Sequence, residues 1–270
     1  MNNPAYRLAY EDLALMNEDD LRPLRLQLEL LKPERALHRH GINSTVVVFG
    51  SARTISQESA KQHLAEVERR YAKQPDDPQV QTALKTAKRQ LRQADYYEEA
   101  RRFSMLVSAR FQQENRRDFV VVTGGGPGIM EAANRGAYEA DARSIGLNIT
   151  LPHEQKPNPF ITPDLAFRFH YFALRKMHFL MRAKALVAFP GGFGTFDELF
   201  GALTLIQTGK MQRIPVVLFG AEFWKQAVNF DFLIAEGVIE PKDRDLFFIV
   251  ETAEQAINIL LEFYQGRPPQ

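Results

Sequence analysis

Short runs of apolar and β-branched residues alternate with stretches of helical composition over most of this 270-residue chain. Such alternation is typical of βα units, which predict a parallel, doubly wound sheet with helices on both faces. We therefore predict a Rossmann-like α/β fold, in which ligands bind outside the carboxyl ends of the strands. The expected strands are Thr45–Phe49, Phe119–Val122, Ile145–Leu151, Ala166–Tyr171, Ala185–Phe189, Pro215–Phe219 and Leu246–Val250. The expected helices among them cover about residues 128–142, 172–183, 195–207, 223–235 and 253–264.

A long segment between the first two expected strands is rich in charged, helix-forming residues. No glycine lies between Gly50 and Gly124. The sequence QPDDP at 74–78 interrupts this segment, so we predict two long helices joined by a turn. This helical hairpin is an insertion at about residues 55–117. The sequence leaves open whether it packs on the core with a solvated outer face or serves as an arm for a partner or a second copy.

The first 43 residues are predicted to be a helical extension. Leu21, Leu24, Leu28 and Leu31 trace an apolar stripe along it, and Pro33 lies near its end. A packing role is expected for such a stripe. The chain thus divides into a helical extension at 1–43 and a single Rossmann-like domain at 44–270 that carries the hairpin.

The composition excludes several classes of protein. The chain has no cysteine, which excludes disulfides, thiolate metal sites and a cysteine nucleophile. Its formal net charge of +1 gives no reason to expect nucleic acid or an anionic membrane as a partner. The N-terminus is acidic and no apolar run approaches the length of a membrane span, so we expect neither a secretory signal nor a span. A soluble, cytoplasmic protein is expected.

A glycine loop follows the second expected strand and opens a helix that includes Met130. A strand, glycine loop and helix in this order present backbone N–H groups and the positive end of a helix dipole to an anion. The spacing differs from the GxGxxG fingerprint, and no clear acidic residue follows to hold a ribose. A plain tight turn therefore remains a second interpretation. The loop consists of Gly124, Gly125, Gly126, Pro127 and Gly128.

A second glycine cluster lies in PGGFGTFDE at 190–198, and it contains Gly191, Gly192 and Gly194. We expect Thr195 to be the N-cap of the following helix, with its hydroxyl and N–H groups available to a phosphate. Thr195 and Glu198 also match a capping box, in which Glu198 would only bond back to the Thr195 N–H. Spacing alone does not decide between a binding loop and a capping box.

Arg175 and Lys176 lie just past the end of the fourth expected strand, where a ligand would bind. Two cations there suit an anionic small molecule, although such a pair is also common on a solvated face. The six histidines are scattered, and none pairs with carboxylates at metal-ligand spacing, so no metal site is expected. Three candidate anion sites without a metal cluster indicate a phosphorylated metabolite.

Three motifs together resemble the LOG family, the cytokinin riboside 5′-monophosphate phosphoribohydrolases: GGGPGIMEAANRGA at 124–137, the Arg175–Lys176 pair and PGGFGTFDE at 190–198. The segment FGSAR at 49–53 is similar to the family's first nucleotide loop. The resemblance covers about residues 44–54 and 118–262. The extension, the hairpin and LPHEQKPNPF at 151–160 resemble the longer bacterial branch. Asp197 stands where the family usually has Glu, whereas Glu198 is retained.

The resemblance implies hydrolysis of the N-glycosidic bond of a purine nucleoside 5′-monophosphate, to free base and ribose 5-phosphate. The implied substrates are AMP or a cytokinin riboside 5′-monophosphate, bound by a nucleotide-binding domain without a cofactor. It implies that Glu198 and Arg175 are catalytic. Glu198 would stabilise the oxocarbenium-like sugar or activate water, whereas Arg175 would stabilise the leaving base or fix the carboxylate. The implied substrate- and phosphate-binding residues are Gly50, Ser51, Gly124, Gly125, Gly126, Gly128, Met130, Lys176, Gly191, Gly192, Gly194 and Thr195.

Other interpretations remain at this stage. Family members were often labelled lysine decarboxylases, but the sequence gives no independent support for a pyridoxal-phosphate site. A non-catalytic nucleotide-binding or carrier protein on the same fold is the principal alternative, because fold alone does not fix function. A third possibility makes the helical hairpin an interaction module. The resemblance also implies a homo-oligomer, a dimer or larger, and gives no reason to expect nucleic acid or a membrane as a partner.

Overall fold

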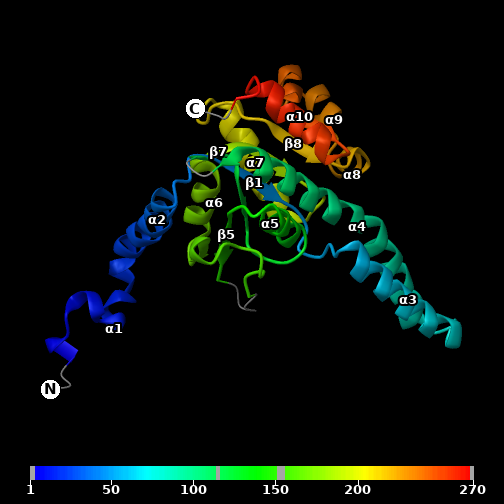
Figure 1. Ribbon diagram of the computed structural model, residues 1–270, viewed down its shortest axis with the longest axis horizontal. Helices are drawn as coiled ribbons and strands as arrows, with labels where there is room; N and C mark the ends of the chain where they lie inside the picture. Colours follow the sequence, from blue (N-terminus) through cyan, green and yellow to red (C-terminus); the bar gives the residue numbers. More distant parts are fainter. Residues whose placement is uncertain (1–3, 114–115, 151–155, 268–270) are drawn as a thin grey trace.

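The computed structural model describes residues 4–113, 116–150 and 156–267. Its centre is a seven-stranded parallel sheet in the order β6-β5-β4-β1-β7-β8-β9 (Figure 1). This confirms the predicted α/β fold class with all seven strands. The strands are β1 Thr45–Phe49, β4 Val120–Thr123, β5 Ser144–Ile149, β6 Ala166–Phe169, β7 Ala183–Ala188, β8 Val216–Phe219 and β9 Phe248–Val250. The expected extension of the third strand to Leu151 falls outside the described residues.

The chain passes from β1 to β4 on one side and returns to β7 on the other side of β1. This reversal of strand order creates a crevice beyond the carboxyl ends of β1 and β7, which is where doubly wound sheets bind their ligands. The glycine loop after β7 and the FGSAR loop after β1 both lie at this crevice. The topology therefore brings together segments that are more than 130 residues apart.

Two apolar layers bury the sheet from both faces. Val46 and Val48 of β1 point into one layer, and Val47 and Phe49 point into the other. Strands buried on both faces are typical of parallel sheets, and they explain why these runs are continuously apolar in the sequence. One layer is covered by α4 Pro78–Phe111, α5 Ile129–Glu139 and α10 Ala253–Phe263; the other by α2 Arg22–Arg39, α6 Phe172–Met181, α7 Phe193–Gln207, α8 Ala221–Ala227 and α9 Phe230–Ala235.

Two helical arms diverge from this body, one to the lower left and one to the lower right of the view (Figure 1). One is the predicted hairpin of α3 Gln57–Lys73 and α4, in which the Asp77 side chain accepts a hydrogen bond from the Gln79 N–H and Pro78 begins the second helix. The other arm is the N-terminal extension. It contains η1 Pro4–Tyr6, η2 Ala9–Glu11, α1 Leu13–Met16, η3 Asp19–Leu21 and the first part of α2. The division of the chain into regions at residue 43 stays a prediction.

The structure corrects several predicted boundaries. The expected helix at 223–235 is two helices, because Val228 adopts an extended conformation and the Asn229 side chain caps a new helix by accepting a hydrogen bond from the Phe232 N–H. The last strand begins at Phe248, since η5 Pro241–Leu246 occupies the residues before it. A two-stranded ribbon, β2 Gln112–Gln113 with β3 Arg116–Arg117, was not predicted. Among the described helices, every one is too short or too polar to cross a bilayer.

Candidate active site

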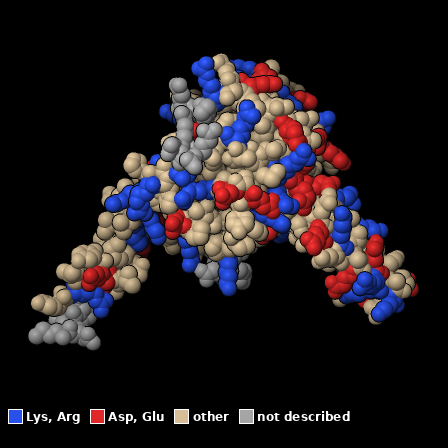
Figure 2. All heavy atoms as spheres, in the orientation of Figure 1, with Lys and Arg blue, Asp and Glu red and all other residues tan. Residues whose placement is uncertain are grey.

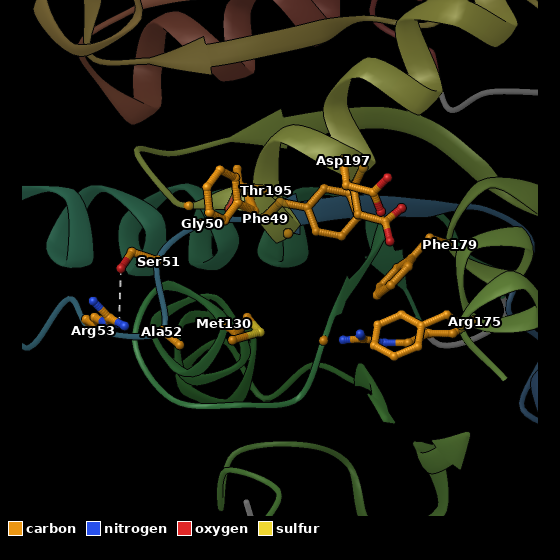
Figure 3. A pocket seen from close by; sticks show the side chains of 16 residues that line it. Phe49, Gly50, Ser51, Ala52, Arg53, Met130, Arg175, Phe179, Thr195 and Asp197 are labelled. Atoms are coloured by element: carbon orange, nitrogen blue, oxygen red, sulfur yellow. Dashed lines mark hydrogen bonds between the residues drawn. The ribbon is translucent and has the colours of Figure 1, made fainter. Parts of the chain in front are cut away.

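A pocket of about 570 Å³ opens at the crevice between β1 and β7 (Figure 3). This volume lies within the range of about 300–1,000 Å³ that is usual for small-molecule sites. Loops after β1, β4 and β7 and the helices α6 and α7 contribute its walls. The residues that line it are Phe49, Gly50, Ser51, Ala52, Arg53, Gly124, Met130, Phe172, Arg175, Phe179, Gly192, Phe193, Gly194, Thr195, Asp197 and Glu198.

The backbone of Ser51 holds the three loops of the pocket together. Its N–H donates to the Pro190 carbonyl at 3.1 Å, and its carbonyl accepts from the Ile129 N–H at 3.1 Å. Gly128 has φ of +75°, and a Cβ added there would overlap the Ser51 carbonyl and lie 2.8 Å from Ala52 Cα. Glycine is therefore required at residue 128 because the first loop packs directly on the second.

A buried network of amides and one hydroxyl fixes the glycine loop after β4. The Gly125 N–H donates to Thr123 Oγ1 at 2.9 Å, and this hydroxyl donates to Asn134 Oδ1 at 2.7 Å. The side-chain amide of Asn158 donates to the Gly126 carbonyl at 3.1 Å and to Asn134 Oδ1 at 3.0 Å. Asn134 and Asn158 thus hold the loop from outside the pocket.

The second glycine loop differs from the prediction at the start of its helix. Helix α7 begins at Phe193 with Gly192 as its N-cap, so Thr195 is inside the first turn and is not the N-cap. The Thr195 N–H donates to the Gly192 carbonyl at 2.9 Å. The capping-box interpretation is therefore wrong, and Glu198 is left without a structural role as a cap.

Glu198 is a buried carboxylate in the wall of the pocket. Glu198 is only 9% exposed, and the Oε2 atom of its carboxylate has no hydrogen-bond partner among the described residues. Burial has the largest effect on the pKa of Glu198 and raises it above its usual value. Among the neighbouring charges, Asp197 also raises this pKa, whereas Lys176 and Arg175 lower it. An acid of this kind, in a pocket and with a raised pKa, is a candidate for general acid–base chemistry.

Arg175 projects from α6 into the same pocket. Its Nε donates to the Leu147 carbonyl at 2.7 Å, and its guanidinium lies 5.3 Å from the ring centroid of Phe179. Burial lowers the pKa of Arg175, and the negative charge of Glu198 raises it. A Cβ on Gly124 would lie 2.5 Å from Arg175 Nη2, so the absence of a side chain at residue 124 makes room for the guanidinium. Arg175 is thus held in place while its Nη atoms remain near the pocket.

The structure brings nine of the predicted site residues to the pocket: Arg175, Glu198, Gly50, Ser51, Gly124, Met130, Gly192, Gly194 and Thr195. Five others do not line it: Gly125, Gly126, Gly128, Lys176 and Gly191. Gly191 packs on the Thr195 side chain, with an added Cβ 2.7 Å from Thr195 Cβ, and Lys176 pairs with Asp197. Where the substrate touches the chain stays a prediction for all of them.

Sequence reasoning missed seven residues of the pocket. Arg53 and Asp197 lie next to motif residues, and their charge was the available signal. The five others are apolar and gave no signal, because such residues are more often part of a core. Among them, Phe193 is 97% exposed although it is large and apolar. The apolar residues that were missed are Phe49, Ala52, Phe172, Phe179 and Phe193.

The donor chemistry of the site is that of carboxylates, guanidinium groups and backbone amides. Of the residues that the structure describes, no three His, Asp or Glu side chains gather as a metal site would require. None of the described residues that line the pocket is a lysine, so the pocket offers no amine for a pyridoxal-phosphate Schiff base. The arrangement instead suits a polar organic substrate with an anionic group.

A doubly wound α/β protein with a small-molecule pocket beyond the carboxyl ends of its strands is thus the class that the fold and the pocket define. Comparison with known proteins gives a more particular relationship. A family model described as "Possible lysine decarboxylase" matches residues 130–260. A cytokinin riboside 5′-monophosphate phosphoribohydrolase of Arabidopsis thaliana is 26% identical over 152 residues, which covers 54% of this chain and 69% of that protein.

Two further comparisons concern one curated relative and one solved structure. A pyrimidine/purine nucleotide 5′-monophosphate nucleosidase of Escherichia coli K12 is 29% identical over 138 residues, or 46% of this chain and 28% of that protein. The solved structure of the molybdenum cofactor carrier protein from Chlamydomonas reinhardtii superposes with a TM-score of 0.46 and 18% identity, over 83% of this chain and 99% of that one. The predicted resemblance to the LOG family is confirmed by the family model and these curated relatives. The relatives are phosphoribohydrolases and nucleosidases of nucleotide 5′-monophosphates.

Proposed function

We propose that this protein hydrolyses the N-glycosidic bond of purine nucleoside 5′-monophosphates, with AMP as the first substrate to test and isopentenyladenosine monophosphate as the second. The observation that carries this proposal is the Glu198 carboxylate, which is buried and unpaired at Oε2 in the same pocket as Arg175. A buried carboxylate without a structural partner is costly to a fold, so a role in chemistry accounts for its presence.

The proposed reaction adds water across one bond. The C1′–N bond of the ribose breaks, its electron pair leaves with the base, and the oxygen of water forms a new bond to C1′. Positive charge develops on the sugar during this step, and the ionised Glu198 stabilises it or accepts the proton of the attacking water. Arg175 stabilises negative charge on the leaving base or orients the carboxylate. The departing base takes up the proton released by the attacking water, and the products are the free base and ribose 5-phosphate.

The shape of the pocket supports an orientation for the substrate. Arg53 and Ser51 lie at one end of the pocket and Arg175 lies at the other, with Met130 and Thr195 between them (Figure 3). We place the 5′-phosphate at the Arg53 end, near Ser51 and the open loop at Gly192 and Gly194, where an added Cβ would meet nothing within 4 Å. The base then lies toward Arg175 and the aromatic residues.

The compartment, the pathway, the oligomeric state and the absence of a cofactor are part of the same proposal. We propose that the protein acts in the cytoplasm, contributes to cytokinin biosynthesis if isopentenyladenosine monophosphate is its better substrate, and works as a homo-oligomer without a cofactor. It acts on small molecules, with no nucleic acid or membrane partner. A panel of nucleoside 5′-monophosphates assayed for released base gives the substrate preference.

The direct test is the release of adenine from AMP by the purified protein and two variants. Glu198→Gln keeps the shape of the side chain but cannot carry the charge, and we expect it to lose at least about 100-fold in kcat. Arg175→Ala should also abolish turnover. If Arg175→Ala instead only raises KM, the arginine is a binding residue. A folded Glu198→Gln protein that releases adenine at the normal rate would refute the mechanism, whereas thermal stabilisation of the wild type by AMP without any release would indicate a carrier.

A further inference from the structure

Lys176 and Asp197, the sequence neighbours of the two candidate catalytic residues, form an ion pair. Lys176 Nζ lies 2.8 Å from Asp197 Oδ1 and also donates to the Asp197 carbonyl at 3.2 Å. Lys176 follows Arg175 on α6, and Asp197 precedes Glu198 on α7. Two pairs of consecutive residues thus meet: Lys176 and Asp197 bridge the two helices, while Arg175, Glu198 and Asp197 itself line the pocket.

The surface of α7 is shaped to receive the lysine. Gly201 lies one helical turn beyond Asp197, and a Cβ added there would lie 3.4 Å from Lys176 Nζ and 3.9 Å from its Cε. The lysine side chain therefore lies against bare helix surface at Gly201 and reaches Asp197 from there. A side-chain carboxylate, a backbone carbonyl and a glycine surface together define one position for the ammonium group.

We propose that the Lys176–Asp197 ion pair positions α6 against α7, so that Arg175 and Glu198 are held in productive geometry across the pocket. The inference rests on the proposed function, because it assigns Lys176 to positioning where the sequence assigned it to substrate binding. Lys176 does not line the pocket. Asp197 does, and Figure 3 shows it across the pocket from Arg175.

The bridge is suited to positioning more than to stability. The Lys176 side chain is 33% exposed and that of Asp197 is 63% exposed, and exposed ion pairs contribute little to folding. Catalysis is more sensitive than folding to small displacements of reacting groups. Burial has the largest effect on the pKa of Glu198, and among neighbouring positive charges Lys176 lowers this pKa more than Arg175 does. The pair thus affects both the place and the ionisation of the carboxylate.

The test compares Lys176→Met, Asp197→Asn and the charge-swapped double variant Lys176→Asp with Asp197→Lys. Each single variant should remain folded and lose about tenfold in kcat, with little change in KM. The swapped variant restores the bridge with the same total number of side-chain atoms and should recover most of the lost kcat. Lys242→Met is the matched control, because Lys242 makes a similar exposed pair with Glu240 away from the pocket.

A second measurement does not depend on turnover. The titration of the Glu198 carboxyl can be followed by carbon-13 NMR in protein labelled at glutamate and assigned by comparison with Glu198→Gln. Lys176→Met should raise the pKa of Glu198, since it removes a neighbouring positive charge, and Lys242→Met should leave it unchanged. The swapped variant should bring it back toward the wild-type value.

These outcomes separate the inference from the proposed function. If the wild type releases no base, the proposed function fails, and the Glu198 titration still decides whether the pair acts on the carboxylate. If Lys176→Met raises KM at constant kcat, Lys176 contacts the substrate and the positioning role is overturned. A swapped variant that is no better than the singles, or a Glu198 titration unmoved by Lys176→Met, would also overturn it.

Discussion

Glu29 of the N-terminal extension binds the start of the helix that carries Arg175. Its carboxylate accepts hydrogen bonds from the backbone N–H groups of His170 at 2.7 Å and Tyr171 at 3.3 Å, which are 141 and 142 residues further along the chain. Helix α6 has no side-chain cap from its own N-cap residue, Tyr171. A carboxylate at this end satisfies unpaired N–H groups and interacts favourably with the helix dipole. Helix α2 thus supplies the cap that α6 lacks.

Glu29→Ala should therefore lower the free energy of unfolding by about 1 kcal/mol, which is the usual cost of losing a helix cap. Because α6 carries Arg175, kcat should also fall. Chemical denaturation and AMP turnover measure the two effects. Glu68→Ala on the exposed face of α3 is the control and should change neither. Equal stability of Glu29→Ala and the wild type would show that α6 does not need this cap.

Glu198 should make the protein less stable at neutral pH. Burial raises the pKa of Glu198 above its usual value of 4.5, so ionisation of this group costs more in the folded chain than in the unfolded chain. The cost is absent well below pH 4.5, and it is fully present once the pH exceeds the folded pKa. Glu198→Gln should thus be more stable than the wild type at pH 7, and this advantage should vanish as the pH falls below 4.5.

Denaturation at several pH values measures this difference, with Glu236→Gln as the exposed control. A Glu198→Gln protein that is less stable than the wild type by the same amount at every pH would contradict the prediction. It would mean that the carboxylate is satisfied in the folded chain.

Arg53 should discriminate in favour of phosphorylated ligands. The side chain is exposed at the end of the pocket opposite Arg175, and a charge-assisted bond to a phosphate contributes about 1.5–3 kcal/mol. Arg53→Ala should therefore weaken inhibition by ribose 5-phosphate by about tenfold or more and leave inhibition by ribose unchanged. Arg53→Lys should retain part of the preference, and Arg69→Ala on α3 is the control. If Arg53→Ala weakens inhibition by ribose 5-phosphate and by ribose equally, the phosphate binds elsewhere in the pocket.

Gly128 should be far less tolerant of substitution than Gly192. Alanine at residue 128 must adopt φ of +75° and overlap the backbone of the Ser51 loop, so Gly128→Ala should cost more than about 2 kcal/mol. Gly192 has φ of −98° and open space around its Cα, so Gly192→Ala should change stability by less than about 0.5 kcal/mol. Thermal unfolding of both variants tests the contrast. Similar losses at the two positions would mean that Gly128 is not under steric constraint.

The sequence predicted the sheet well because each strand is apolar throughout and each is followed by a recognisable helix. The predicted helix boundaries were wrong where a single hydrogen bond or one turn of the chain decides where a helix begins. Asn229 starts a new helix with one hydrogen bond, and this interrupts the helix expected at 223–235. Thr195 was expected as an N-cap because its hydroxyl suits that position, but α7 begins two residues earlier at the glycine loop.

The candidate site was predictable only as far as it lies in short motifs. Arg175 and Glu198 were named from motifs and do meet at one pocket. Periodicity and spacing do not reveal which glycines face a pocket and which face another loop, so Gly128 and Gly191 could not be told from Gly192 and Gly194. The contact of Glu29 with α6 is set by tertiary packing of the extension, and nothing in its local sequence indicated it.

Charge on the face of the molecule in Figure 2 does not single out one region. Figure 2 shows Lys, Arg, Asp and Glu interspersed over the body and the hairpin, which agrees with a net charge of +1. Under the proposed function, groups inside the pocket such as Arg53 and Arg175 attract the anionic substrate. Such attraction acts at short range and is screened less by salt than a surface field would be.

The amide network of Thr123, Asn134 and Asn158 has a consequence for the conditions under which the site keeps its shape. All three side chains are neutral dipoles, so neither protons nor dissolved ions alter their hydrogen bonds over the ordinary range of pH and salt. The loop at Gly124–Gly128 should thus keep the same geometry as pH and salt concentration change. Under the proposed function, a change of activity with pH then reports on the ionisation of Glu198 or the substrate, and not on a rearrangement of this loop.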